Sequence, residues 1–416
     1  MMETLIEIGK HAKSASKKLS LESSTRKNNA LFEIAKALKD NMDYILGENE
    51  KDMEKARRGN LSNAILDRLM INENRIDAMC NELKSIAALP DPIGEVVKVI
   101  KRPNNLRISQ IRVPIGVIGI IYEARPNVTV DAAAICIKSG NAVILRGGAE
   151  AIHSNIAIAN VISNAVVRAG LPEGCVQLIH DTDRETALNM MRLNEYIDVL
   201  IPRGGAGLIK SVVNHSTVPY IETGVGNCHI YVHSDGDLKM AEEIVVNAKV
   251  QRPGVCNAME TLLVHEAVAK EFLPMIYKRL SAHGVELCGC EKTLDILPDI
   301  AIASEADWET EYLDLKLAVK LVKTLDEAIE HIEKYGTKHS EAIITDSYRD
   351  GERFLKEVDA AAVYINASTR FTDGSQFGFG AEIGISTQKL HARGPMGLNE
   401  LTSMKYIIHG EGQVRE

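Results

Sequence analysis

The sequence predicts an α/β protein with two doubly wound domains, each built on a parallel sheet. Short, almost wholly apolar runs alternate with helical segments from residue 113 onward, as buried parallel strands do, and the alternation starts again near residue 228. A chain of 416 residues is also too long for one ordinary core. These observations favour two open sheets with a helical block ahead of the first.

The first part of the chain has the apolar spacing of helices. In residues 31–38 the apolar positions recur three and four apart, which gives one buried face, and Ser23 or Ser24 offers an N-cap. The prolines and the glycine of 90–94 end this block. The charged, β-rich stretch 97–113 is then expected to form a hairpin arm.

The two α/β series can be placed by residue range. In the first, we expect strands at 117–122, 142–146, 176–179 and 198–202 and helices at 131–140, 152–170 and 184–193. In the second, we expect strands at 229–234, 260–265, 315–322, 341–345 and 361–366 and helices at 237–250 and 266–284. The glycine-rich last 50 residues would be exposed loop unless they dock on another part of the chain.

Composition excludes several classes of function. A net charge of −9 gives no general attraction to nucleic acid or to an anionic membrane. The N-terminus lacks an export signal and an apolar run long enough to span a membrane, so we expect a soluble, cytoplasmic protein. The 7 cysteines are an odd number and are spread along the chain, so we expect reduced thiols and no disulfide framework.

One cysteine stands out as a candidate nucleophile. Cys256 lies in the Pro- and Gly-containing segment 252–257, after an expected helix and before an expected strand, where an irregular turn can aim a backbone N–H at a reacting oxygen. The alternative is a buried cysteine that acts as a small hydrophobe. We expect that alternative for Cys80, Cys136 and Cys175, which are flanked by helix or strand residues.

Two more polar residues lie in loops at expected strand ends. Glu222 precedes a glycine-rich turn at the end of an expected strand, and a solvated carboxylate is its alternative interpretation. Asn127 lies between a strand and a helix, where doubly wound folds bind ligands, and helix capping is its alternative. The paired glycines of 145–150 and 201–207 would let backbone approach a phosphate, although each turn alone is weak evidence.

An amide, a carboxylate and a thiol in this order, Asn127, Glu222 and Cys256, resemble the active site of the aldehyde dehydrogenase superfamily. The segment 322–343 resembles the signature of a branch of that superfamily that reduces an acyl phosphate. The likeness extends over essentially the whole chain, through YEARPN, ETGVGN, RPGVCN, YINAST and ARGPMGLNELTS. It implies an aldehyde dehydrogenase-like fold: two doubly wound α/β domains plus a small β oligomerisation arm.

The resemblance also implies a reaction. The expected activity is NADPH-dependent reduction of L-glutamyl 5-phosphate to L-glutamate 5-semialdehyde in proline biosynthesis, through a thioester on Cys256, with the amide of Asn127 at the oxyanion. The glutamyl chain comes from the resemblance alone. The role of Glu222 is open, because a carboxylate that activates water would waste the thioester; it either assists thiol deprotonation or is turned away.

The resemblance also places the ligands. The adenosine phosphate is expected near Arg146, Gly147 and Gly148, the pyrophosphate near Arg203, Gly204 and Gly205, and the nicotinamide ribose at Glu311 or Glu309. Arg146 suits a 2′-phosphate and so favours NADPH over NADH, unless it is only a surface charge at a strand end. Substrate candidates are Arg125, Ser368, Thr369, His391 and Arg393. Their alternative interpretation is as solvated loop residues, and it applies most strongly to Arg393.

We expect no metal site. His229 and His233 would lie roughly 13 Å apart on a strand, too far to share an ion. Cys288 and Cys290 have no second pair of ligands nearby in the sequence.

The expected domains follow the same resemblance. They are a cofactor-binding domain (1–100 and 114–227), a catalytic domain (228–365), an arm (101–113 and 400–416) and a return segment (366–399). The arm implies a homodimer or a larger assembly, and a glutamate kinase that makes the acyl phosphate is a candidate partner. Rival interpretations are a hydrolytic NAD(P)-dependent aldehyde dehydrogenase and a noncatalytic binding protein on the same scaffold.

Overall fold

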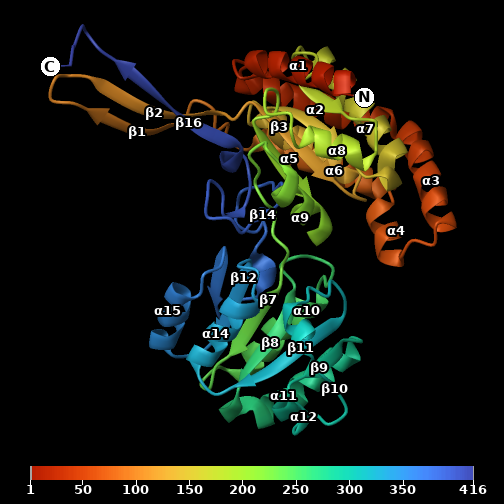
Figure 1. The fold of residues 1–416 in the computed structure, drawn as a ribbon, viewed down its shortest axis with the longest axis vertical. Helices are drawn as coiled ribbons and strands as arrows, with labels where there is room; N and C mark the ends of the chain where they lie inside the picture. The colour runs from red at the N-terminus through yellow and green to blue at the C-terminus, as the bar shows by residue number, and fades with distance from the viewer. Residues whose placement is uncertain (1, 416) are drawn as a thin grey trace. The chain divides into compact units, whose positions relative to one another are not determined.

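The computed structural model describes residues 2–415, which form two compact units (Figure 1). The first unit comprises Met1–Thr223, Gly378–Gly384 and Met396–Glu416, and the second comprises Gly224–Phe377 and Ile385–Pro395. The boundary therefore precedes the expected one after residue 227. The expected return segment, 366–399, also divides between the two units. Gly384 and Met396 both belong to the first unit, where the Met396 N–H donates to the Gly384 carbonyl at 2.8 Å.

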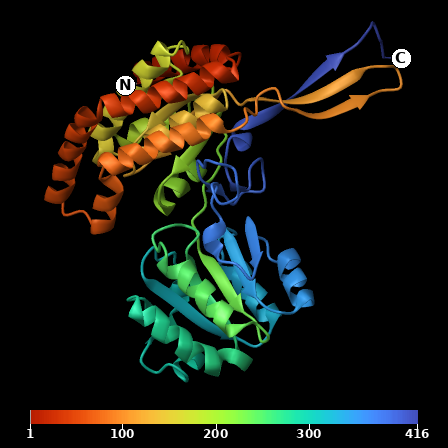
Figure 2. The ribbon, with the colours of Figure 1, turned by 180° about the vertical axis from the view of Figure 1, so that it is seen from behind.

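The predicted helical block is confirmed. It consists of α1 (Met2–Leu19), α2 (Ser24–Asp40), α3 (Met42–Arg58), α4 (Asn63–Leu69) and α5 (Glu73–Ala88). Ser23 caps α2 by accepting the Arg26 N–H at 3.3 Å. The block ends at Ala88, ahead of Pro90, as the sequence indicates. Helix α2 packs against α5 and α7 of the same unit (Figure 2).

The first unit contains a parallel sheet with the order β5-β4-β3-β6. Its elements are β3 (Val117–Tyr122), α6 (Asn127–Lys138), β4 (Ala142–Arg146), α7 (Ile152–Arg168), β5 (Val176–Leu178), α8 (Arg184–Met190), β6 (Val199–Arg203) and α9 (Ala206–His215), with short 3-10 turns at Ala149–Ala151 and Asn399–Leu401. Every residue of β3 is buried, which explains its apolar sequence. Winding reverses at β3, so the loops after β3 and β6 meet where doubly wound sheets bind ligands.

An antiparallel sheet of the first unit joins distant segments of the chain. Strands β1 (Val96–Lys101), β2 (Arg107–Pro114) and β16 (Thr402–His409) pair in the order β1-β2-β16 and form the long twisted ribbon of Figure 1. The hairpin prediction is confirmed, and the C-terminal segment docks as a strand. Its pairing with β2 is continuous from Thr402 opposite Pro114 to His409 opposite Arg107.

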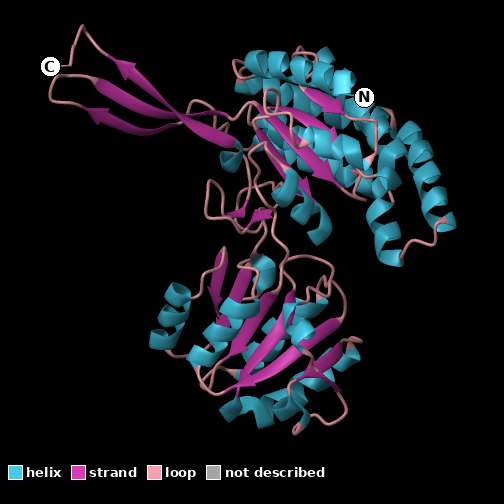
Figure 3. Cartoon of the chain, in the orientation of Figure 1, coloured by secondary structure: helices cyan, strands magenta, loops and turns pink. Residues whose placement is uncertain are grey.

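The second unit is built on a parallel sheet with the order β10-β9-β11-β8-β7-β12-β13, flanked by helices (Figure 3). The strands are β7 (Cys228–Val232), β8 (Met259–His265), β9 (Glu286–Gly289), β10 (Ala301–Ile302), β11 (Lys316–Val322), β12 (Ser340–Ile344) and β13 (Ala362–Ile365). The helices are α10 (Leu238–Val250), α11 (Glu266–Ala282), α12 (Glu291–Leu294), α13 (Glu305–Glu309), α14 (Leu325–Tyr335) and α15 (Tyr348–Glu357). A 3-10 turn (Thr369–Phe371) and the short pair β14 (Ile385–Ser386) and β15 (Gly394–Pro395) complete it.

The α/β prediction for both halves of the chain is therefore confirmed. Asp237, Thr324 and Ser347 cap α10, α14 and α15 with their side chains, which sets where these helices begin. Within residues 2–415, every helix is too short or too polar to cross a lipid bilayer.

Candidate active site

Cys256 lies in an irregular turn between the end of α10 and the start of β8, and it is partly exposed. The next residue anchors this turn, since Asn257 is buried and its amide donates to the Thr372 carbonyl at 2.8 Å. In return, the Thr369 hydroxyl donates to the Asn257 carbonyl at 2.8 Å. The thiol therefore sits on backbone that is held against the turn Thr369–Phe371.

The predicted motifs 222–227 and 252–257 meet through Gly226. A Cβ added at Gly226 would lie 1.5 Å from the Cys256 carbonyl oxygen, so only glycine fits here. The Gly226 N–H donates to Glu311 Oε1 at 2.8 Å, and the buried Cys228 thiol donates to the same Cys256 carbonyl at 3.2 Å. Glu311 thus belongs to the Cys256 neighbourhood, whereas Glu309 is an exposed residue at the end of α13.

Arg370 is a neighbour of Cys256 that the sequence analysis missed. Its guanidinium donates to the Asn257 side chain and, through Nε, to Gln251 Oε1 at 2.7 Å. Burial lowers the pKa of Arg370, while Asp373 and the Cys256 and Cys228 thiols oppose that shift. A guanidinium near a thiol favours the thiolate. The sequence signal that could have found Arg370 is its position directly after the two hydroxyl residues that end YINAST.

The substrate candidates of the second unit have contacts of their own. The Ser368 hydroxyl accepts the Arg370 N–H at 3.3 Å, and with Thr369 it is buried inside the turn. Arg393 donates to Asp359 at 2.7 Å in an exposed ion pair, and His391 is exposed with a φ of 71°. These contacts give Ser368 and Thr369 a structural role, and substrate binding by these four side chains stays a prediction.

In the first unit, Asn127 is the first residue of α6. Pro126 precedes it at the N-cap, and this helix has no side-chain cap hydrogen bond, so the capping alternative is wrong. The Asn127 amide instead donates to Asp131 Oδ2 at 2.9 Å, one turn along the helix. This bond fixes one N–H of the amide, which leaves the other as the candidate donor to an oxyanion.

Asp131 holds Asn127 at an electrostatic cost. Within residues 2–415, its Oδ1 is buried without a hydrogen-bond partner. Burial raises the pKa of Asp131 to about 8, and the Glu82 carboxylate acts in the same direction, whereas Asn127 and Arg203 oppose it. The folded chain therefore holds a proton here that the unfolded chain releases at lower pH.

Stability should consequently fall as the pH rises through the neutral range. A raised carboxyl pKa means that the folded state binds more protons than the unfolded state, so the free energy of unfolding decreases with pH. We expect Asp131→Asn to remove this decrease, which would amount to at most about 4 kcal/mol between about pH 5 and pH 9. Urea unfolding of both proteins, followed by circular dichroism, measures it. A difference that stays constant with pH would contradict the assignment.

The two glycine-paired turns follow β4 and β6, at the same edge of the sheet. Arg146 donates to the carbonyls of Thr182 and Asp183, and its Nε is buried without a partner. At the second turn, the Gly205 N–H at the start of α9 donates to Glu123 Oε2 at 2.8 Å. This helix N-terminus therefore already holds an anionic oxygen, as a phosphate site requires.

The remaining predictions concern Glu222, Arg125 and three cysteines. Glu222 lies in an irregular segment after an isolated bridge between Tyr220 and Leu200, so its expected strand is wrong; burial raises the pKa of its carboxyl. Arg125 is exposed in the loop before α6. Cys80, Cys136 and Cys175 are buried, as expected for cysteines that act as small hydrophobic residues.

Comparison with known proteins decides the family. Residues 3–296 match the model of the aldehyde dehydrogenase family. The chain belongs to this family. It is 63% identical to a gamma-glutamyl phosphate reductase of Clostridium perfringens over 100% of both chains, and 60% identical to one of Caldanaerobacter subterraneus over 98% of both. The crystal structure of gamma-glutamyl phosphate reductase from Thermotoga maritima shares 53% identity and a TM-score of 0.97, covering 99% of this chain and 100% of that one.

A more distant member of the aldehyde dehydrogenase family shares only the fold. An acetylating aldehyde dehydrogenase from Geobacillus thermoglucosidasius is 18% identical, with a TM-score of 0.70 over 100% of this chain and 98% of that one. The two-unit architecture with a small antiparallel sheet is thus the aldehyde dehydrogenase fold, as expected.

Aldehyde dehydrogenases bind a nicotinamide cofactor, and the first unit fits one. The N-terminus of α9 accepts an anionic oxygen, and a Cβ at Gly204 would come within 2.6 Å of the Glu123 carboxylate, so the turn has little room for a side chain. A Cβ at Gly147 would likewise meet Asn155 at 2.1 Å. Glu123, which accepts the Gly205 N–H, is itself exposed.

Proposed function

We propose that this chain reduces L-glutamyl 5-phosphate to L-glutamate 5-semialdehyde with NADPH, through a thioester on Cys256. The observation that carries the proposal is the Cys256 turn, which is held by Gly226, Asn257 and the Thr369–Phe371 turn in a chain whose full-length relatives are named gamma-glutamyl phosphate reductases. Such a turn presents a thiol on rigid backbone beside a guanidinium.

The first half of the reaction uses the thiolate. Cys256 Sγ attacks the acyl carbon, a C–S bond forms, and the C–O bond to phosphate breaks. Phosphate is already a good leaving group, so no acid is needed to protonate it. Arg370 supports the thiolate by its charge, and the backbone N–H of Cys256 together with the free N–H of the Asn127 amide is proposed to stabilise the oxyanion.

The second half reduces the thioester. A nicotinamide cofactor held at the turns after β4 and β6 would supply the hydride, and therefore the two electrons, that reduce the thioester carbon. The C–S bond then breaks, the aldehyde leaves, and the sulfur takes up a proton. Burial raises the pKa of the Glu222 carboxyl. A raised pKa suits a carboxylate that accepts the proton of the Cys256 thiol better than one that must stay ionised.

Cofactor choice is proposed to depend on Arg146. Its partly buried guanidinium has an unpartnered Nε, and a bidentate donor suits a 2′-phosphate. Nearby carboxylates of Glu150, Asp181 and Asp183 partly offset the charge, so the preference for NADPH should be graded and not absolute. Glu311 is the proposed contact of the nicotinamide ribose.

The reverse reaction provides the test. With L-glutamate 5-semialdehyde, we expect NADP⁺ reduction that requires inorganic phosphate or arsenate, a slower rate with NAD⁺, and a lower rate with the aspartate homologue. The homologue should lose only about 10- to 200-fold, because one methylene is weakly discriminated. The absorbance of the reduced nicotinamide, NADPH or NADH, measures each rate. Full activity without phosphate would instead identify a hydrolytic dehydrogenase.

We also propose that β1 and β16 form an interface with a second copy of the chain. Both are edge strands of the β1-β2-β16 sheet, and Val97, Val99, Tyr406 and Ile408 are exposed on them. Pairing would cover these residues and the unpaired strand edges. A cytoplasmic location and association with a glutamate kinase stay predictions.

A further inference from the structure

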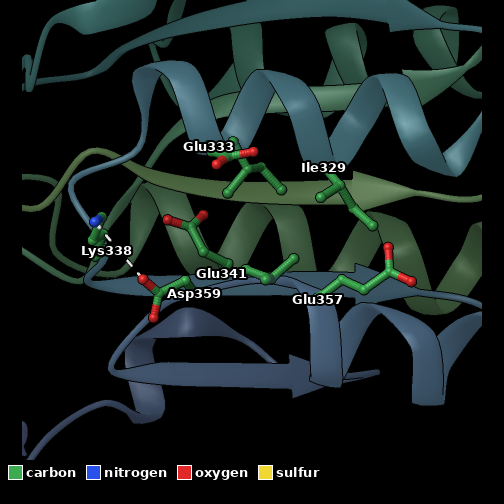
Figure 4. A pocket seen from close by; sticks show the side chains of 8 residues that line it. Ile329, Glu333, Lys338, Glu341, Glu357 and Asp359 are labelled. Carbon is green, nitrogen blue, oxygen red and sulfur yellow. Dashed lines mark ion pairs between the residues drawn. The ribbon is translucent and has the colours of Figure 1, made fainter.

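The second unit contains a cavity that the proposed reaction does not use. It lies between the C-terminal half of α14, the start of β12 and the end of α15, and its volume is about 110 Å³ (Figure 4). That volume corresponds to about four water molecules at roughly 30 Å³ each. Ile329, Ile332 and Val358 give it an apolar wall.

Glu341 lines this cavity, and one oxygen of its buried carboxylate is unsatisfied. The side chain is fully buried, and its Oε2 accepts the His229 backbone N–H at 2.7 Å and lies 3.0 Å from His229 Nδ1. Its Oε1 is also buried but has no hydrogen-bond partner in the described part of the chain. A buried acceptor without a donor is costly, and burial raises the pKa of this carboxyl for the same reason.

The other acidic residues at the cavity differ in whether a cation already pairs with them. Glu357 accepts two hydrogen bonds from Arg353, at 2.7 and 3.0 Å. Asp359 is held by Lys389 at 2.6 Å and Arg393 at 2.7 Å. By contrast, Glu333 makes no hydrogen bond or ion pair within residues 2–415. Within the described residues Glu333 is therefore the carboxylate without an ion pair, and Glu341 pairs with His229 through Oε2 alone.

Lys338 provides the opposite charge. Its ammonium is 3.7 Å from Asp359, which has two closer cations, so Lys338 is only loosely engaged. Figure 4 shows Glu333 and Glu341 on the side of the cavity where Lys338 lies. The cavity thus has one carboxylate without an ion pair, Glu333, a second with one unsatisfied oxygen, Glu341, an available ammonium and an aliphatic wall.

These features select the chemistry of a ligand. In the described residues, no three His, Cys, Asp or Glu side chains are placed as metal ligands, and a phosphate would be repelled by the carboxylates. We propose that this cavity binds a small aliphatic α-amino acid as its zwitterion. The ammonium would donate to Glu341 Oε1 and Glu333, the carboxylate would face Lys338, and the aliphatic side chain would pack on Ile329, Ile332 and Val358.

Binding to the full-length chain provides the test. Ligand-observed NMR and calorimetry with L-alanine, L-valine and L-leucine should give saturable binding at or below about 10 mM for at least one of them. Isobutylamine and isovalerate, which lack the carboxylate and the ammonium of valine, should bind at least about tenfold more weakly. Equal binding of one of these analogues, or no saturable binding of any of the three amino acids, would overturn the proposal.

Variants locate the site. Glu341→Gln keeps the acceptor for His229 but removes the charge, and with Glu333→Gln and Lys338→Met it should weaken binding at least about tenfold. Glu333 and Lys338 are exposed, so their variants remain informative if Glu341→Gln misfolds. Glu330→Gln is the matched control, since Glu330 is exposed on α14 but does not line the cavity. Affinity that is unchanged in Glu333→Gln and Lys338→Met would place the amino acid elsewhere.

Discussion

A Cys256→Ser protein is expected to fold like its parent and to lose reductase activity by a factor of about 10⁴ or more. The hydroxyl of serine stays protonated at neutral pH, whereas a thiol beside Arg370 can ionise and attack the acyl phosphate. NADPH oxidation measures the rate, and mass spectrometry of a quenched reaction should find the acyl group on the parent chain only.

Cys290 provides the control thiol. It is partly exposed in the same unit, but its sulfur contacts Thr293 at 3.2 Å and lies outside the Cys256 turn. Cys290→Ser should therefore retain the parent rate. Substantial activity in Cys256→Ser, or an acyl adduct on another cysteine, would refute the thioester route.

Replacing Gly226 by alanine should have the second-largest effect. The added Cβ would lie 1.5 Å from the Cys256 carbonyl oxygen and 2.7 Å from its Cα, so the backbone of the turn must move. A displacement of about 1 Å at a nucleophile costs roughly 10²-fold in rate. We expect kcat/KM to fall by that factor or more, with slower alkylation of Cys256 by iodoacetamide.

A glycine elsewhere controls for the substitution itself. Gly47 lies within α3, and a Cβ there would meet nothing within 4 Å. Gly47→Ala should leave activity unchanged and stabilise the helix by up to about 1 kcal/mol. If Gly226→Ala kept parental kinetics, the close approach of Gly226 to Cys256 would not be needed for catalysis.

The sequence could predict buried elements because burial leaves a local pattern. The apolar run VIGIIY is β3, with every residue buried, and the spacing in 31–38 is the buried face of α2. Cys256 was also found locally, since Pro253 and Gly254 mark an irregular turn. Such signals need only a few neighbouring residues.

Side-chain rotamers and contacts between distant segments leave no such pattern. The bond from Asn127 to Asp131 depends on a side-chain rotamer, so a helix cap was an equally reasonable interpretation. Arg370 reaches the Cys256 turn only because the 3-10 turn Thr369–Phe371 folds against Asn257, more than a hundred residues earlier in the chain. The local sequence predicts substrate contacts for the hydroxyls of Ser368 and Thr369. It does not reveal that these hydroxyls already make hydrogen bonds within the turn and to Asn257.

The pairing of β16 with β2 affects how the chain folds while it is being synthesised. The ribosome releases β1 and β2 early, but their partner emerges only after the whole second unit, which corresponds to a delay of roughly 15–60 seconds. Throughout that interval one flank of β2 has no hydrogen-bonding partner. Nascent chains should therefore be most prone to aggregate through this hairpin, and chaperone demand should end when the final strand arrives.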